Sequence, residues 1–198
     1  MTNLRIQRAA EEFNRFAERM AAPARCDPTL SFDTPALAQV ASVWREKAAG
    51  RDMPLRRDMG ARALKPFLPN VVVLDVVETG GQRRYLIRLM GTSIAEVLGE
   101  HTGKFLDETI ISPFRERWSA AMDATVSAGS PIRLSGRVDY GGHDYLAMEM
   151  VLAPVAQCDD SSAAIVGVAY TRYSARHIFD PLVRNTVSSR PRNKAWAG

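Results

Sequence analysis

Residues 88–108, RLMGTSIAEVLGEHTGKFLDE, lead from a predicted strand into a short helix and then into a glycine-rich turn. Ile94, Val97 and Leu98 share one face of this helix, and Gly99 can end it. The segment GEHTGK has three residues between its glycines and a phenylalanine after its lysine, whereas a phosphate-binding loop needs four residues and a Ser or Thr. We therefore interpret the glycines as turns that let strand become helix and helix become loop.

Apolar and alternating segments on both sides of this stretch predict a sheet, because β-branched residues and a period of two are typical of strands. Five strands are predicted, at residues 71–78, 84–90, 131–140, 143–154 and 163–173. The glycines of TGGQ join the first two strands, and Gly141 and Gly142 join the third to the fourth. A longer helix is predicted at residues 112–129. This order predicts an α+β domain with a five-stranded antiparallel sheet.

Two helices are predicted ahead of the sheet. Residues 4–21 are amphipathic, and a second helix starts after Thr34 with Pro35 in its first turn. The chain is thus divided into a helical extension, a proline-punctuated connector, a core and a polar basic tail: residues 1–50, 51–69, 70–175 and 176–198. The breakers in APARCDPTLSFDTP separate the two helices.

Composition narrows the class of protein. The chain has 198 residues, a net charge of +4 and 46% hydrophobic residues, which is ordinary for a globular domain. No stretch approaches the ~18 apolar residues of a membrane span, and the N-terminus has acids and arginines where a signal peptide has an apolar segment. We therefore expect a cytoplasmic protein without a membrane partner.

The residues that usually carry chemistry form no known catalytic or metal-binding arrangement. Cys26 and Cys158 lie far apart, and His101, His143 and His177 have no spacing that puts two imidazoles on one metal. The adjacent acids of LDE diverge on any regular element and do not pair as acid and base. We expect no catalytic residue, no metal site and no enzymatic activity, and the cofactor stays unknown.

Two long segments carry a family resemblance. WREKAAGRDMPLRRDMGARALKPFLPNVVVLDVVE at 44–78 and YLIRLMGTSIAEVLGEHTGKFLDE at 85–108 resemble the alphaproteobacterial PAS-like family of small stand-alone proteins, within the PAS-domain superfamily. The family's R-L-x-G-T and G-x-x-L-D-E motifs are met by Arg88, Leu89, Gly91 and Thr92, and by Gly103, Leu106, Asp107 and Glu108. The resemblance implies a PAS-like five-stranded antiparallel sheet with helices on one face and an N-terminal helical extension.

The resemblance also implies a pocket between sheet and helices. Strand parity puts Leu134, Met148 and Met150 on the inner face, with Trp118 facing them from the long helix, and methionine lets a cavity adapt its shape. A plain filled core is the alternative. Arg88 interrupts an apolar strand, so that it either lies on the wet face, which we favour, or is a buried charge paired with an acid or an anionic ligand.

Cofactors known from PAS proteins find little support in the residues. Haem would depend on His101 as an axial ligand, because the long helix has no histidine. Flavin photochemistry needs a reactive cysteine on the helical segment between the two groups of strands, and neither cysteine lies there.

A dimer is the expected assembly, because PAS domains often dimerise through an amphipathic helix ahead of the core. The apolar stripe of Ile6, Phe13, Phe16 and Met20 suits this role, or it folds back on its own sheet.

The expected function is a sensory or regulatory module of signal transduction. It would act as a homodimer, through contact with an unidentified signalling protein, with or without a small-molecule ligand. The alternative is a nucleic-acid-associated regulator that uses Arg51, Arg56, Arg57 and the basic tail. Most basic residues alternate with acids instead of forming a stripe, which makes nucleic acid the weaker prediction.

Overall fold

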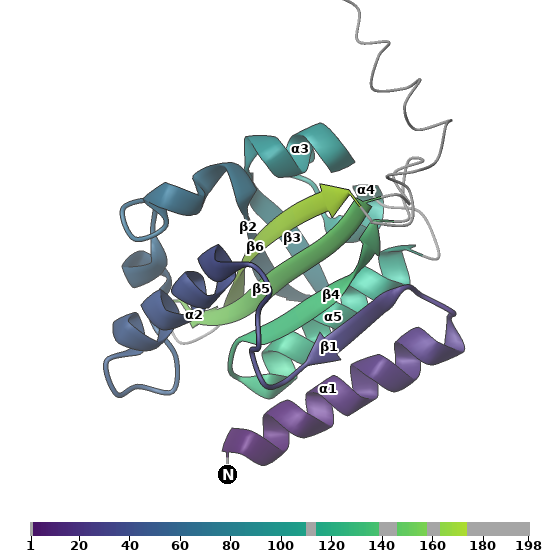
Figure 1. The fold of residues 1–198 in the computed structure, drawn as a ribbon, viewed down its shortest axis with the longest axis horizontal. Helices are drawn as coiled ribbons and strands as arrows, with labels where there is room; N and C mark the ends of the chain where they lie inside the picture. The colour runs from purple at the N-terminus through teal and green to yellow at the C-terminus, as the bar shows by residue number, and fades with distance from the viewer. Residues whose placement is uncertain (1, 110–113, 139–145, 158–162, 174–198) are drawn as a thin grey trace, which may run out of the picture.

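A six-stranded antiparallel sheet forms the centre of the computed structural model, which describes residues 2–109, 114–138, 146–157 and 163–173 (Figure 1). The strands are β1 Ala24–Asp27, β2 Val71–Thr79, β3 Gln82–Met90, β4 Ile132–Val138, β5 Leu146–Ala156 and β6 Ala163–Tyr173. They lie in the order β1-β4-β5-β6-β2-β3. The five predicted strands are confirmed, and β1 is a sixth. The predicted turn at Gly141 and Gly142, and the C-terminal tail, lie outside the described residues.

Helices cover both faces of the sheet. The helical elements are α1 Thr2–Arg19, α2 Pro35–Ala48, the 3-10 helices η1 Arg56–Met59 and η2 Lys65–Asn70, α3 Thr92–Leu98, α4 Leu106–Thr109 and α5 Phe114–Ala128. The helices of the core, α3 to α5, pack on one face, and α2 from the extension packs on the other with η1 and η2. Alternate residues of each central strand therefore enter two separate apolar cores.

The sequence predicted no strand between α1 and α2, and β1 adds an edge strand there. Cys26 of β1 pairs with Leu134 of β4. The Asn14 side chain on α1 donates to the carbonyl of Cys26 at 3.0 Å and accepts from its N–H at 2.8 Å. Gly136 permits the close approach, since a Cβ there would lie 2.1 Å from the carbonyl oxygen of Pro23. Partners this distant in sequence leave no local pattern.

The apolar stripe of α1 is partly covered by the same chain. Phe13 is only 2% exposed and packs in the core cluster that includes α5 and β4, while Ile6 and Phe16 are partly buried. Met20 remains 41% exposed. The structure packs α1 against α5 and β1 of its own chain, and the role of the stripe in a dimer stays a prediction.

The glycines of residues 88–108 have two different roles. Gly99 and Gly103 have φ of +87° and +85°, so that their interpretation as turn residues is confirmed. Gly91 has φ of −70°, which any residue can adopt. A Cβ at Gly91 would lie 2.3 Å from the carbonyl oxygen of Leu68 and 2.4 Å from that of Pro69. The turn interpretation is therefore wrong for Gly91, which is needed because η2 passes too close for a side chain.

Candidate functional site

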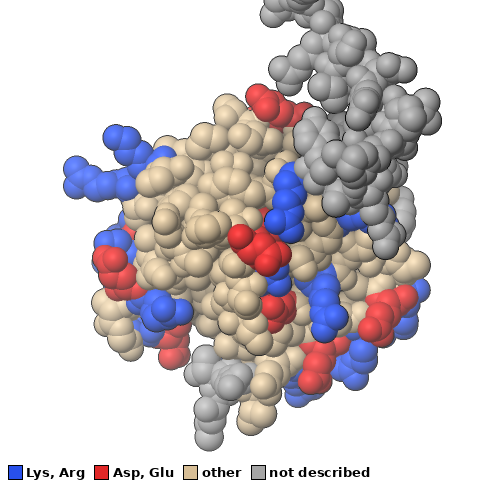
Figure 2. Space-filling model, in the orientation of Figure 1, with Lys and Arg blue, Asp and Glu red and all other residues tan. Residues whose placement is uncertain are grey.

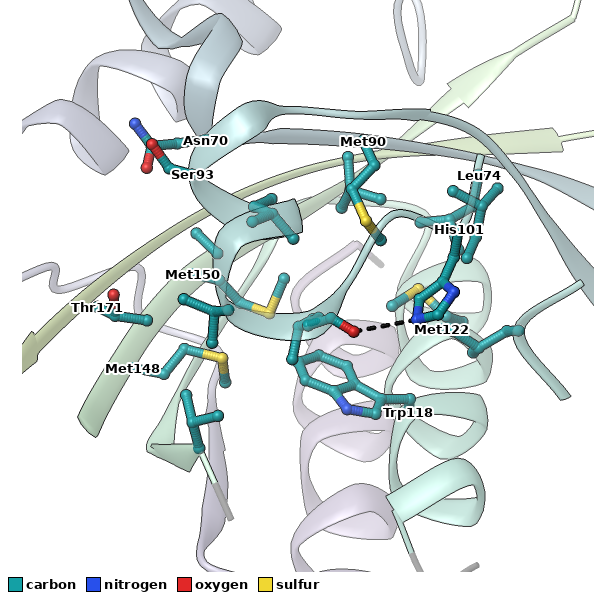
Figure 3. A pocket seen from close by; sticks show the side chains of 18 of the residues that line it. Asn70, Leu74, Met90, Ser93, His101, Trp118, Met122, Met148, Met150 and Thr171 are labelled. Carbon is teal, nitrogen blue, oxygen red and sulfur yellow. Dashed lines mark hydrogen bonds between the residues drawn. The ribbon is translucent and has the colours of Figure 1, made fainter. Parts of the chain in front are cut away.

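A cavity of about 100 Å³ lies between the sheet and the helices α3 and α5 (Figure 3). Its wall is largely apolar and includes four methionines, one from β3, one from α5 and two from β5: Met90, Met122, Met148 and Met150. The two methionines of β5 are alternate residues, so that both point to the same face of the sheet. Unbranched thioether side chains can change rotamer at low cost, and the wall is therefore adaptable.

Three of the predicted pocket residues meet at this cavity. Trp118, Met148 and Met150 all line it. Leu134 is buried on the same face but is not part of the lining. Its strand, β4, lies beyond β5 as seen from β6 and β2, and Leu134 pairs with Met150 on one side and Cys26 on the other. Leu134 therefore fills the core beside the cavity.

Arg88 lies away from the cavity. A β-bulge between Val73 and Leu74 shifts the register of β2 against β3. The Arg88 side chain is 52% exposed, and its Nε pairs with Asp75 Oδ2, while Asp75 Oδ1 accepts from Arg56. The favoured wet-face interpretation fits this placement, and a role of Arg88 in lining the cavity does not.

The connector arginines named for nucleic-acid binding are partly committed to the fold. Arg51 Nη2 lies 2.7 Å from Asp58 Oδ2, and Arg56 Nη1 lies 2.5 Å from Asp75 Oδ1. Arg57 is exposed. On the face drawn in Figure 2, basic and acidic side chains are interspersed. These pairs neutralise part of the charge that a phosphate backbone would need.

A strap at residues 99–108 closes one side of the cavity and contributes His101 and Leu106 to its wall. The strap is tied to the edge strand β3, where Gly103 N–H donates to Ile87 O at 2.8 Å and Ile87 N–H donates to Lys104 O at 3.0 Å. The LDE motif at the end of the strap makes further contacts with β3, through one arginine of that strand.

That arginine is Arg84. It donates two hydrogen bonds of 2.8 Å to Asp107 and one of 2.9 Å to Glu108, and its guanidinium lies 3.8 Å from the centre of the Phe105 ring. The hydrogen bond from Arg84 outweighs burial and lowers the pKa of Asp107. Asp107 and Glu108 are therefore both ion-pair partners of Arg84, and they meet at its Nη2, so that the predicted divergence of the two adjacent acids is wrong.

His101 is one of several cavity residues that the pocket prediction did not contain. Its Nε2 lies 3.0 Å from the carbonyl oxygen of Leu98. Its Nδ1 is buried and makes no hydrogen bond within the described part of the chain. The one ligand-binding role that the sequence suggested for His101 was that of an axial haem ligand. The cavity of about 100 Å³ is smaller than a haem group. A lone histidine in a loop carries no signal that it will line a cavity.

Arg117 also enters the lining and is 4% exposed. Its guanidinium carbon lies 5.7 Å from the ring centre of Phe114 and 5.5 Å from that of Trp118, within cation–π range. Met122 lies four residues, about one helical turn, after Trp118, so that helical periodicity predicts both on the same side of α5.

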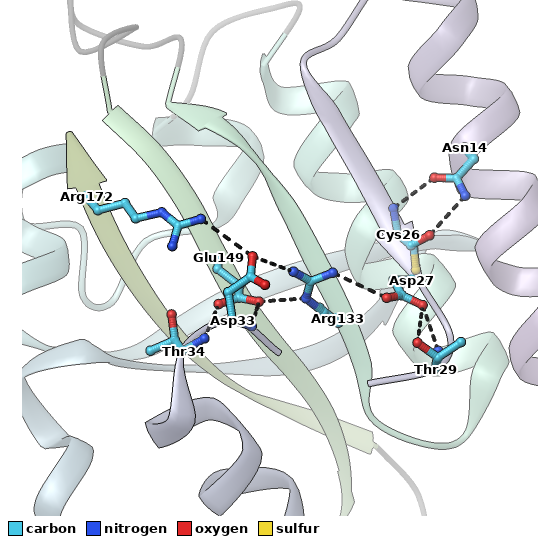
Figure 4. Close-up of polar contacts among 9 residues, drawn as sticks. All are labelled: Asn14, Cys26, Asp27, Thr29, Asp33, Thr34, Arg133, Glu149 and Arg172. Carbon is cyan, nitrogen blue, oxygen red and sulfur yellow. Dashed lines mark hydrogen bonds and ion pairs between the residues drawn. The ribbon is translucent and has the colours of Figure 1, made fainter. Parts of the chain in front are cut away.

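The opposite face of the sheet carries a polar clamp on the start of α2, formed by Asp27, Asp33, Thr34, Arg133 and Glu149 (Figure 4). Glu149 accepts from the N–H groups of Asp33 and Thr34 at 2.9 and 2.8 Å. Arg133 Nε lies 2.6 Å from Glu149, and its two other nitrogens reach Asp27 and Asp33 at 3.3 and 3.2 Å. The network fastens the extension to the sheet.

The clamp carboxylates have shifted pKa values. Burial acts to raise the pKa of Glu149, but hydrogen bonds from Thr34, Asp33 and Arg133 outweigh it and lower the pKa below 4.5. At Asp27 burial is likewise outweighed, by hydrogen bonds from Thr29 and Arg133. Both groups are therefore stabilised in the charged form.

The described residues show no arrangement suited to metal or thiol chemistry. Among them, no three His, Cys, Asp or Glu side chains lie together as metal ligands. Burial raises the pKa of the Cys26 thiol to about 12, so that the nucleophilic thiolate is scarce at neutral pH. In the same part of the chain, none of the helices combines the length and apolar character needed to span a bilayer.

Comparison with known proteins identifies the fold family. No curated protein matches the chain. Residues 32–170, more than two thirds of the chain, match a family model described as PAS domain. The match begins just ahead of α2 and ends within β6, so that it includes the strap, most of the clamp and all of the cavity lining except Thr171. The chain therefore belongs to the PAS domain family.

Proposed function

We propose that this chain is a sensory module of a signalling system that binds a small molecule in the methionine-lined cavity. PAS domains are generally sensory or regulatory, and the feature that supports ligand sensing here is the cavity itself. Four methionines and Trp118 surround about 100 Å³ of free space beneath a strap that is held by side-chain contacts. In the proposed function, the bound state passes to a signalling protein by direct contact, and the chain acts as a homodimer.

The size of the cavity limits the ligand. Pockets for drug-sized molecules have volumes of about 300–1,000 Å³. A cavity of about 100 Å³ suits a smaller molecule, although rotamer changes of the methionines can enlarge it. The proposed ligand is therefore a molecule with few non-hydrogen atoms and not a large cofactor.

Native and denaturing mass spectrometry of the purified full chain test both parts of the proposal. We expect the native spectrum to show a dimer and an additional mass that is lost on denaturation. A native monomer would contradict the homodimer. If the native mass shows no ligand, the protein is titrated with small apolar molecules. Failure to bind any of them would contradict ligand sensing.

A matched pair of variants locates the additional mass. Ala169 of β6 lines the cavity and is paired with Met150 on the neighbouring strand β5. Ala147 lies on the same sheet but outside the lining. Ala169→Leu fills part of the free space and is expected to abolish retention of the ligand, while Ala147→Leu retains it. Equal retention by both variants would show that the ligand binds elsewhere.

A further inference from the structure

The wall of the cavity contains a hydrogen-bond acceptor that has no donor among the described residues. A carbonyl oxygen only accepts, so the contact between Leu98 O and His101 Nε2 requires the hydrogen on Nε2. In the neutral ring, Nδ1 then presents a lone pair. Within the described residues nothing donates to this buried atom. A buried polar atom without a partner is costly, so that a donor supplied from outside the chain is favoured there.

The surroundings of the ring offer apolar contact. Trp118, Met122 and Leu106 line the cavity together with His101. In Figure 3 the His101 ring lies at one end of the lining, and the uncharged polar side chains of Asn70 and Ser93 lie at the other. Arg117 also lines the cavity, with its guanidinium carbon 5.5 Å from the ring centre of Trp118. The acceptor therefore lies among mainly apolar side chains, where a hydrogen bond is shielded from water and discriminates strongly between ligands.

We propose that the ligand is a compact, uncharged and largely apolar molecule that carries one hydroxyl or N–H group and donates it to His101 Nδ1. This inference rests on the proposed function, since it specifies the chemistry of a molecule in the same cavity. An apolar cavity of about 150 Å³ holds benzene. The present cavity of about 100 Å³ with adaptable methionine walls suits a molecule about the size of phenol.

Phenol and toluene form the test pair, because they have nearly the same shape and differ in a hydroxyl against a methyl group. Their association constants are measured by calorimetry or NMR titration on the full-length wild type and on two variants. His101→Gln places an amide near the position of Nε2 and can keep the bond to Leu98 O, but it removes Nδ1. His101→Asn places a polar atom near Nδ1 and serves as the conservative control.

We expect the ratio of the phenol to the toluene association constant to fall about 5- to 10-fold in His101→Gln, as loss of one hydrogen bond predicts. In His101→Asn the ratio is expected to recover at least in part. A ratio that stays within about twofold of wild type in His101→Gln, with both molecules still bound, overturns the inference and leaves the proposed function standing. Binding of neither molecule by the wild type at millimolar concentration contradicts the proposed function itself.

A measurement on the wild-type chain does not depend on the folding of any variant. In protein labelled with ¹⁵N-histidine, a donor bound to Nδ1 moves the resonance of that nitrogen, whereas toluene offers no donor. We expect phenol to shift the His101 Nδ1 resonance and toluene to leave it nearly unchanged. Equal shifts with both molecules would overturn the assignment of His101 Nδ1 as the acceptor.

Discussion

The two faces of the sheet are built on different physical principles, although the same strands form both. On the cavity face, Met148 and Met150 of β5 border free space and can change rotamer. On the opposite face, Glu149 between them is 6% exposed and is held by Arg133 and by two backbone N–H groups at the start of α2. One face can therefore adapt to a ligand while the other fixes the extension in place.

The largest loss of stability is expected from a substitution that weakens the contact of α2 with the sheet. Trp44 is buried against the second core, and its Nε1–H donates to Pro154 O at 2.7 Å. Trp44→Ala should lower the free energy of unfolding by about 3–5 kcal/mol, because it leaves a void and an unpaired carbonyl. Urea denaturation measures the loss. Trp44→Phe keeps most of the packing and should lose less, and a loss under about 1 kcal/mol for alanine would show that α2 is not an integral layer.

The clamp is expected to contribute somewhat less. Glu149→Ala removes the acceptor for two backbone N–H groups and one partner of Arg133. Loss of one partner in a buried ion pair costs about 3–5 kcal/mol, and we expect about 2–3 kcal/mol because Asp27 and Asp33 remain near Arg133. Amide hydrogen exchange should rise first at the start of α2. Unchanged exchange there would separate the clamp from the docking of the helix.

The cavity face should tolerate truncation better than its neighbouring core. Met150 and Leu152 lie on the same strand and the same face, but only Met150 borders the cavity. Met150→Ala should cost about 1–2 kcal/mol, below the usual 2–5, because its contacts are already incomplete. Leu152→Ala is the matched control and should cost about 3–4 kcal/mol. Equal losses in thermal or urea unfolding would mean that the cavity wall is packed as tightly as the rest of the core.

The smallest expected effect is the pH dependence that the clamp adds. The pKa of Glu149 is lower in the folded chain than its ordinary 4.5, so that its ionised form stabilises the fold above that pH. This contribution is lost as pH falls through the folded-state value. Glu149→Gln should therefore be less stable than wild type at neutral pH, and the difference should narrow below about pH 4. A constant difference across the acid range would assign the effect to shape and not to charge.

Much of the fold follows from local pattern. Alternating residues predicted β4 and the face of β5 that holds Met148 and Met150, and the turn glycines predicted the hairpin of β2 and β3. Trp118 was predicted to face those methionines because helix and strand periodicity each define an inner side. Such signals depend only on neighbouring residues, so that a single sequence contains them.

The sequence did not contain the relations between distant segments. The cavity excludes Leu134 and includes His101 and Arg117. Leu134 is excluded because β4 lies beyond β5, and His101 is placed by the hydrogen bonds of the strap to β3. Placing a side chain in a particular wall requires the full set of tertiary contacts, because periodicity defines a side of an element and not its neighbour.

By itself, then, the sequence determined the α+β order, five strands and the family motif, since each is written in residues close along the chain. Only the tertiary structure decided that Gly91 makes room for η2, that β1 completes the sheet, and that Glu149 fastens α2. The physical reason is that close approach, edge pairing and ion-pair partners are made by backbone and charge from segments far apart. Their geometry exists only once the chain is folded.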